Sequence, residues 1–438
     1  MSQNDKIFLA GAAKGIITPP LGTALYGYPS RRIAASVHDD LTVTAAVFSD
    51  GETVAALAAI TLCSIPEPLH RKARAAVESA TGIHHLIFST NHTHSGPATS
   101  TTPGWGNSDD AYIDEIFLPV LVRTIQDAQK NLRPAELGIG EAESYVGVNR
   151  RAVRENGSVW LGVNPWGIYD PRMRVIAIRS TEDQSVIATI THIGAHGTSA
   201  GGIGDTPITR DWSGVMTDRL ERITQAPALF INGAEGDVAP RAPGPLRLNG
   251  VQVIDRIDQV ADIGGRAACD AALAYSRIKS YEIPPFSVIE GEINLPYEPL
   301  GDPEEAKRQL EELDENVQGL KLYEKRHWES VIELANEPVQ TALTYQQTIF
   351  RLGNIVIVPH PFEIFSAIAL RLADYSPYAY TLSLSNSNGS YGYLPTKEDI
   401  HRGGYEVWSS RYRYGYVLTE DADTEIISQN LKLLRDNK

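Results

Sequence analysis

Two histidines separated by a single residue are the first side chains in this sequence that could do metal chemistry. His92 and His94 lie in residues 86–97, which begin as a β-branched and aromatic run and end in polar residues followed by glycine and proline. This pattern predicts a buried strand that ends in a loop. If the backbone stays extended there, both imidazoles point to the same side and could bind one metal ion, or one could bind it and the other donate a hydrogen bond. The alternative is a polar loop that contains two of the chain's 11 histidines by chance.

A second histidine follows another predicted strand. Residues 185–192 have the composition of a strand and lead into a glycine-rich loop that contains His196. Residues 228–231 then predict a short buried strand, which runs into a further glycine-rich segment at 232–240. Because ligands gather at the carboxyl ends of strands in open α/β sheets, these loops are candidates for one common site.

An acidic residue and several tyrosines lie in the last quarter of the chain. Glu363 follows a predicted strand at residues 355–358, in what we expect to be the first turn of a helix. A carboxylate at such a position can also serve only to complement the helix dipole. Tyr391 and Tyr393 belong to a polar loop, and Tyr405 lies twelve residues beyond Tyr393.

The segments between these candidates predict a mixed α/β fold, in which β-sheets are flanked by helices and the site lies in loops at strand ends. Strands are predicted at residues 42–49 and 53–62, which form a hairpin across an Asp-Gly turn, and at 85–90, 136–146, 173–179, 185–192, 228–231, 287–295, 341–352, 355–358 and 380–384. Helices are predicted at residues 66–80, 109–131, 212–224, 251–278 and 419–435, with Gly264-Gly265 as a point where the fourth could break.

No internal repeat or linker divides the chain, so we expect one compact domain over residues 1–438. The charged segment 302–337 predicts a pair of helices inserted in this domain. Such a pair is either a solvated hairpin or a lid over the site.

Composition excludes several classes of protein. The 438 residues include 39 basic and 54 acidic side chains, a net charge of −15, without a basic run, so we expect neither nucleic acid nor a membrane surface as partner. Cys63 and Cys269 are the only cysteines, which argues against a disulfide framework and against zinc bound by thiolates. The first residues lack the pattern of a signal peptide and no apolar run could span a bilayer. We therefore expect a cytoplasmic protein with a small-molecule substrate, and homo-oligomerisation is left open.

Taken in order, the motifs resemble the catalytic domain of the neutral, non-lysosomal ceramidases, which hydrolyse the amide of N-acyl-sphingosine with one zinc ion. The sequences His-Thr-His-Ser-Gly-Pro at 92–97, His-Gly-Thr-Ser at 196–199 and Gly-Asp-Val-Ala-Pro at 236–240 are similar to loops of that family. Further similarities are Asp211, Phe362-Glu363, the spacing of Tyr393 and Tyr405, and the landmarks Asn149-Arg150 and Asn164-Pro165. The resemblance covers most of the chain in consecutive pieces.

The resemblance implies a zinc site. Carried over by position, the ligands are His92, His196, Glu363 and Tyr393. Two imidazoles and a carboxylate are a familiar ligand set of catalytic zinc, and a nearby dication stabilises a phenolate. The nitrogen and oxygen ligands favour zinc, although manganese or iron could occupy the same set.

The resemblance also implies residues that face the substrate, namely His94, Arg150 and Tyr405. His94 and Tyr405 would donate hydrogen bonds to the oxyanion of a tetrahedral intermediate. Arg150 would hold a polar or anionic group of the substrate, with a surface ion pair as its alternative role. We also expect Arg241 and Tyr391 to contact the substrate.

Three departures from the family shape the functional hypothesis. Ala239 stands where the family has a catalytic serine, Arg241 stands where it usually has asparagine, and we expect no C-terminal β-sandwich domain. We therefore predict a zinc-dependent hydrolase that cleaves an amide or ester bond of a small polar substrate, acidic or sugar-derived, rather than ceramide. The two alternatives are a zinc-dependent lyase acting on a carboxylate or uronate, and a non-catalytic metal-dependent binding protein.

Overall fold

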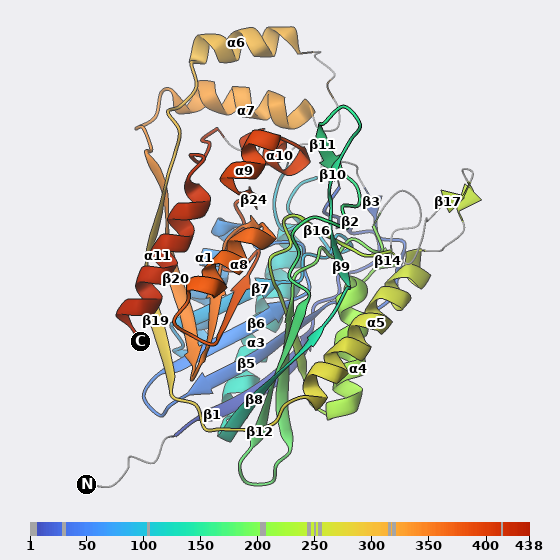
Figure 1. The fold of residues 1–438 in the computed structure, drawn as a ribbon, viewed down its shortest axis with the longest axis vertical. Helices are drawn as coiled ribbons and strands as arrows, with labels where there is room; N and C mark the ends of the chain where they lie inside the picture. Colours follow the sequence, from blue (N-terminus) through green and yellow to red (C-terminus); the bar gives the residue numbers. More distant parts are fainter. Residues whose placement is uncertain are drawn as a thin grey trace.

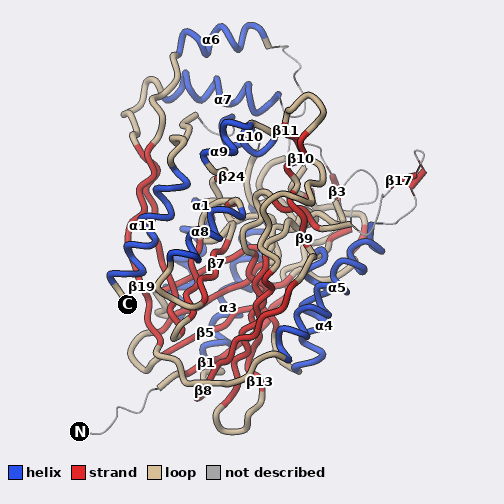
Figure 2. Tube along the Cα trace, viewed as in Figure 1, coloured by secondary structure: helices blue, strands red, loops and turns tan. Residues whose placement is uncertain are grey.

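The computed structural model describes the chain apart from residues 1–6, 29–31, 103–105, 202–206, 243–246, 249–250, 253–255, 314–316, 318–320 and 413–414. Within this part, two β-sheets pack face to face and helices cover their outer faces (Figures 1 and 2). This arrangement confirms the predicted mixed α/β class with helices flanking the sheets.

The larger sheet has eight strands in the order β15-β13-β12-β8-β1-β5-β6-β7. Most neighbours are antiparallel, but the pairs β6–β7 and β13–β15 at its two ends are parallel. The strands are β1 (Leu9–Ile16), β5 (Thr42–Ser49), β6 (Val54–Ile60), β7 (His85–Thr90), β8 (Arg133–Glu143), β12 (Arg172–Ser180), β13 (Val186–Ile193) and β15 (Ala228–Asn232).

The smaller sheet has the order β19-β20-β21-β23, and its last pair, β21–β23, is also parallel. Its strands are β19 (Phe286–Pro296), β20 (Ala342–Leu352), β21 (Ile355–Pro359) and β23 (Tyr380–Leu384). The candidate loops follow the strands of the three parallel pairs. Parallel neighbours place their carboxyl ends at the same edge, so this topology brings the loops together.

Short strand pairs connect these elements. They are β2 (Ala24–Leu25) with β3 (Arg32–Ile33), β4 (Ser36–Val37) with β14 (Pro207–Ile208), β9 (Gly147–Asn149) with β16 (Val238–Pro240), β10 (Arg151–Val153) with β11 (Val159–Leu161), β17 (Arg247–Leu248) with β18 (Val251–Gln252), and β22 (Glu363–Ile364) with β24 (Tyr393–Leu394).

The core between the sheets is built from alternating strand residues that point inwards. Phe48 and Ile87 of the larger sheet pack with Phe286, Phe350 and other apolar side chains of the smaller one. Separate apolar clusters join the outer faces to their helices. Each sheet is therefore buried on both faces, which explains the nearly continuous apolar runs of β5, β6 and β21.

The helices that cover the two sheets lie in three pairs (Figure 1). One half of the larger sheet is covered by α1 (Glu67–Thr81) and α3 (Leu118–Lys130), and the other half by α4 (Asp211–Thr224) and α5 (Arg256–Ser276). The outer face of the smaller sheet is covered by α8 (Ser366–Tyr375) and α11 (Ala422–Asp436). The remaining helices are α2 (Asp110–Tyr112), α6 (Pro303–Glu312), α7 (Lys321–Leu334), α9 (Lys397–Arg402) and α10 (Tyr405–Tyr412).

The predicted helical pair at 302–337 is confirmed as α6 and α7, which pack against each other. Helix α7 also packs on α10, where the Tyr323 and Trp408 ring centroids are 5.8 Å apart. The pair lies over the end of the molecule where α10 and β24 are found (Figure 1). No described helix is both long and apolar enough to cross a bilayer.

The structure differs from the sequence prediction in three details of these elements. The helix predicted at 251–278 begins at Arg256, after the short strand β18, and it continues through Gly264-Gly265 because both glycines pack closely against α4. The helix predicted at 109–131 contains a π-helical turn at Ile113–Phe117. Glu363 does not open a helix, since it forms part of β22 and α8 begins three residues later.

His360 provides a test of the fold that depends on pH. Its side chain is fully buried between β21 and β22, and burial lowers its pKa to about 3. The unfolded chain takes up this proton near pH 6.5, so the contribution of His360 makes the folded state less stable as the pH falls from 7 towards 3. Between pH 7 and 5 the loss is about 2 kcal/mol.

We expect His360→Leu to remove this part of the pH dependence. Urea unfolding of the metal-free protein at pH 7 and pH 5 would measure it as a difference between the variant and the wild type. An equal loss of stability in both proteins would contradict the prediction.

Candidate metal centre

Three loops that are far apart in the sequence meet at one buried cluster. His92 follows β7, His196 follows β13, and Glu363 lies in β22 just after β21. The Nε2 atoms of His92 and His196 lie 3.5 Å and 3.2 Å, respectively, from the same carboxylate oxygen of Glu363, Oε2. All three side chains are buried, and together they could hold one metal ion.

The backbone at His92 differs from the extended chain assumed above. His92 has a φ of 59°, in the left-handed region that non-glycine residues rarely adopt. The two neighbouring imidazoles nevertheless meet, with 3.1 Å between His92 Nε2 and His94 Nε2. The two rings therefore lie at one site because the backbone turns at His92. The argument from extended strand geometry was wrong.

Backbone contacts between the two histidine loops hold this turn in place. The His94 amide donates to Gly197 O at 3.0 Å, and Thr93 and Gly197 form an isolated β-bridge. A Cβ atom at Gly197 would lie only 2.8 Å from His92 O. Glycine is therefore required here by the close approach of two backbones.

The second histidine loop is also fixed by a buried acid. The Asp211 carboxylate accepts hydrogen bonds from the Ser199 and Ala200 amides at 3.1 and 2.8 Å. The neighbouring Trp212 donates through its indole N–H to His196 O at 2.9 Å. Asp211, whose position matched the family pattern, thus supports the loop rather than the metal ligands directly.

The hydrogen bond of the Nδ1 atom sets the orientation of each imidazole ring. His92 Nδ1 lies 2.7 Å from Cys63 O, and His196 Nδ1 lies 2.8 Å from Glu235 O. A carbonyl only accepts hydrogen bonds, so each Nδ1 carries the proton and each Nε2 has its lone pair available for a metal. Burial, together with the positive charge of Arg150, lowers the pKa of His196 to about 3, which keeps this ring neutral.

Tyr393 lies beside the carboxylate because β22 and β24 pair at Glu363 and Tyr393. Arg150 Nη2 donates to the Tyr393 hydroxyl oxygen at 3.0 Å, and Arg150 Nε donates to buried Glu406 at 2.7 Å. Burial and the Glu363 carboxylate raise the pKa of Tyr393, and the Arg150 charge opposes this shift. Arg150 is only 7% exposed, and its ion pair with Glu406 is buried. The alternative interpretation of Arg150 as a surface ion-pair residue was therefore wrong.

The predicted substrate-facing residues do not all lie together. His94 is buried next to His92, and the Tyr405 ring centroid is 5.9 Å from that of Tyr393 at the start of α10. Tyr391 instead packs against Phe362. The Arg241 side chain lies over the Tyr145 ring and donates to a backbone carbonyl at Gly147.

Ala239, at the position of the family serine, lies on β16 opposite Val148 of β9. This register places it across from the strand that leads directly into Arg150.

Glu235 is a site residue that sequence analysis missed. Its carboxylate accepts from Asn386 Nδ2 at 2.7 Å and from Asn232 Nδ2, and Asn386 Nδ2 also lies 3.1 Å from His92 Nδ1. Its backbone oxygen accepts from His196 Nδ1. Glu235 therefore orients His196 through its backbone oxygen, and its carboxylate holds the Asn386 amide beside the His92 ring. The sequence did contain a signal for this residue: an acidic side chain among small residues, in a loop that follows a buried strand.

Comparison with solved structures identifies the fold. The neutral ceramidase from Pseudomonas aeruginosa is similar with a TM-score of 0.75 and 18% identity, over 98% of this chain and 74% of that one. A ceramidase complexed with C2 gives a TM-score of 0.75 at 17% identity, over 99% and 76% of the two chains. No family model and no curated protein sequence matches. The chain therefore has the ceramidase fold, as the resemblance implied.

We expect Gly197→Ala to displace the His92 loop. The new Cβ would lie 2.8 Å from His92 O and 2.9 Å from Thr93 Cα, so the two loops must separate. The expected loss is about 1 to 3 kcal/mol of unfolding free energy, as for other overpacked sites. Gly96→Ala is the matched control, because its Cβ would make only ordinary contacts at 3.5 Å. Equal thermal stability of both variants would contradict this account.

We expect Glu235→Gln to weaken metal binding by about 10- to 100-fold, the usual effect of losing a residue that orients metal ligands. The glutamine amide would face donors on Asn232 and Asn386, so one of these contacts is lost. Competition against a chelator would measure the affinity. Glu290→Gln, which changes an exposed carboxylate, is the control. Unchanged affinity in Glu235→Gln would show that the side chain does not position the histidines.

Proposed function

We propose that this chain is a zinc-dependent hydrolase that cleaves an amide or ester bond in a small polar substrate. The observation that carries this proposal is the convergence of His92, His196 and Glu363 in one buried cluster, with the imidazole lone pairs directed at the carboxylate. The likeness to the two ceramidase structures supports the same reaction class.

The donor set fits a zinc ion. Within the described residues, His196 Nε2 is buried without a hydrogen-bond partner, although the carboxylate of Glu363 lies beside it. His92, His196 and Glu363 would hold the ion, with Tyr393 as the fourth candidate ligand. Zinc at such a site supplies a Lewis acid that activates water and polarises a carbonyl group.

His94 is suited to stabilise the developing oxyanion. Because the His92 Nε2 atom has the lone pair, the proton between these two rings belongs to His94 Nε2. With the lone pair of His92 used in metal binding, this His94 N–H would be available to a substrate oxygen. Burial and the nearby imidazoles lower the pKa of His94, so it acts as a neutral hydrogen-bond donor.

Arg150 positions Tyr393 while Glu406 balances its charge. Tyr405 lies next to Tyr393 and is the second candidate donor to a substrate oxygen. Ala239 lacks the hydroxyl of the family serine, so the substrate and its orientation need not be those of ceramide.

A zinc-dependent lyase is the second candidate function. The contact between Arg150 and the Tyr393 hydroxyl favours it, because the guanidinium charge opposes the rise in the Tyr393 pKa and stabilises the phenolate that would serve as the base. A carboxylate or uronate substrate would then lose a proton next to its carboxylate group.

We expect His196→Ala to lower zinc affinity by more than about 100-fold, since even residues that only orient ligands are worth about 10- to 100-fold. Metal analysis of the purified protein would measure this directly. His85→Ala, which changes a partly exposed histidine on the same sheet, should retain the metal. Wild-type protein without stoichiometric metal would contradict the proposal.

Activity of the metal-loaded enzyme would separate the candidate functions. A panel of amides, esters and uronates should yield hydrolysis products that are lost in His92→Ala. Unsaturated products would instead identify the lyase, and metal binding without turnover would identify a binding protein. Ala239→Ser tests whether the missing hydroxyl restricts cleavage of N-acetylsphingosine.

A further inference from the structure

The imidazole of His94 lacks the hydrogen bond that orients the other two histidines of the site. His92 and His196 each donate through Nδ1 to a backbone carbonyl. The Nδ1 atom of His94 is buried and has no hydrogen-bond partner among the described residues. Its Nε2 atom lies against His92 Nε2, the atom that we propose as a metal ligand. Another part of the structure must therefore hold this ring in the orientation that a substrate oxygen requires.

The β2–β3 hairpin, described at residues 24–28 and 32–33, packs against the His94 ring. The Tyr28 ring centroid is 4.9 Å from that of His94, and the two rings meet edge to face. A Cβ atom at Gly27 would lie 2.4 Å from Cγ and 2.6 Å from Nδ1 of His94. Gly27 also has a φ of +114°, which glycine adopts at little cost. Residues 27 and 28 thus limit the space that the His94 ring can occupy.

Arg32 holds the backbone of His94 from the same hairpin. Its Nη2 atom donates to His94 O at 2.6 Å and to Tyr26 O at 2.9 Å, so one guanidinium joins the hairpin to the loop. The guanidinium carbon lies 4.4 Å from the centroid of the Tyr28 ring. Arg32 is buried, and hydrogen bonds from a charged donor are stronger than those between neutral groups. The hairpin and the His94 backbone are therefore fixed to each other.

Further contacts connect the hairpin to both histidine loops. The Tyr26 amide donates to Gly96 O at 3.0 Å. A Cβ atom at Gly201, in the second histidine loop, would lie 1.6 Å from the Tyr28 hydroxyl oxygen. Tyr28 therefore lies between the His94 ring and the second histidine loop, in contact with both.

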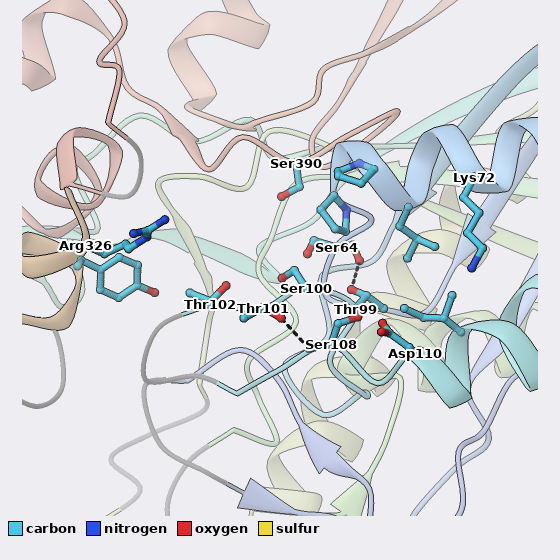
Figure 3. Close-up of a pocket in the computed structure, with 15 residues that line it drawn as sticks. Ser64, Lys72, Thr99, Ser100, Thr101, Thr102, Ser108, Asp110, Arg326 and Ser390 are labelled. Atoms are coloured by element: carbon cyan, nitrogen blue, oxygen red, sulfur yellow. Dashed lines mark hydrogen bonds between the residues drawn. The ribbon is translucent and has the colours of Figure 1, made fainter. Parts of the chain in front are cut away.

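The residues that follow His94 are held by other contacts. Thr99 donates to the Ser64 carbonyl at 2.6 Å, at the wall of a cavity of about 460 Å³ (Figure 3). The hydroxyl oxygens of Thr102 and Tyr26 are 2.6 Å apart. These contacts fix the backbone of the loop, but none of them involves the His94 ring. The position of the ring then depends on its packing against the hairpin.

We propose that the β2–β3 hairpin positions His94 for the reaction, with Gly27 and Tyr28 setting the orientation of its ring and Arg32 holding its backbone. The inference rests on the proposed function in one respect: the His94 N–H is the donor to the substrate oxygen. Such a donor is effective only when it is aimed at the place where charge develops. The hairpin thus determines the geometry at the reacting oxygen without binding the metal.

Gly27→Ala tests the proposal, and Gly22→Ala is its matched control. Both glycines have a positive φ, +114° and +91°, but a Cβ atom at Gly22 would meet no atom within 4 Å. Both variants therefore strain the backbone, and only Gly27→Ala displaces the His94 ring. We expect Gly27→Ala to lower kcat by about 10- to 100-fold, as for a reacting group misplaced by about 1 Å, with little change in KM or zinc affinity. Gly22→Ala should match the wild type in all three quantities.

Substitution of Tyr28 provides a second test, should Gly27→Ala fail to fold. Tyr28→Leu removes the ring that packs on His94 and should lower kcat at unchanged zinc affinity, whereas Tyr28→Phe keeps the ring and should restore most of the activity. Thermal unfolding checks that each variant is folded.

Nuclear magnetic resonance of the histidine rings supplies a readout that needs no substrate. In zinc-loaded protein labelled at histidine Cε1, the His94 signal is assigned by its loss in His94→Gln. Gly27→Ala should shift this signal, and Gly22→Ala should leave it in place. A His94 signal and a kcat that both stay at wild-type values in Gly27→Ala, or equal kcat in Tyr28→Leu and Tyr28→Phe, would overturn the proposal. A shifted His94 signal in a protein whose wild type hydrolyses no substrate would refute the proposed function and still support the hold of the hairpin on this ring.

Discussion

The arrangement of this site depends on two hydrogen bonds from imidazole nitrogens to backbone carbonyls, those of His92 to Cys63 and of His196 to Glu235. They fix which nitrogen carries the proton and so direct both lone pairs at the Glu363 carboxylate. Each carbonyl belongs to a loop after a strand of the larger sheet, whereas Glu363 lies in β22, shortly after β21 of the smaller sheet. The cluster therefore forms only when the two sheets are packed against each other.

This dependence explains why unusual backbone conformations are retained near the site. His92 and Asp211 both have positive φ values, which cost non-glycine residues of order 1 kcal/mol or more. The cost is offset locally, because the turn at His92 brings its ring against Cys63 O and the turn at Asp211 lets its carboxylate accept three backbone amides. The strained φ values at His92 and Asp211 are thus accompanied by hydrogen bonds that these same turns make possible.

Sequence patterns predicted the main strands and helices well, because these elements have strong local periodicity and clear turn signals. The sequence patterns failed where contacts between distant parts of the chain determine the local structure. Glu363 belongs to a short strand because β24, thirty residues later, pairs with it, and the glycine pair in α5 continues the helix because α4 packs there. Glu235 was missed for the same reason, since its partner Asn386 lies far along the chain. Motif order located the metal candidates, but spacing could not reveal that Arg150 pairs with Glu406.

The buried network around Arg150 bears directly on the chemistry. At the position where the family has a serine, Ala239 offers no polar atom, yet β16 and β9 still place this segment next to Arg150. The polar groups that remain beside the His92, His196 and Glu363 cluster are then the Tyr393 hydroxyl, held by Arg150, and the neighbouring Tyr405. A phenol held by a guanidinium is a fixed donor and proton carrier, whereas a serine hydroxyl rotates freely. Under the proposed function, control of the reacting oxygen would therefore pass from the Ala239 loop to the Arg150–Tyr393 pair, which α10 anchors through Glu406.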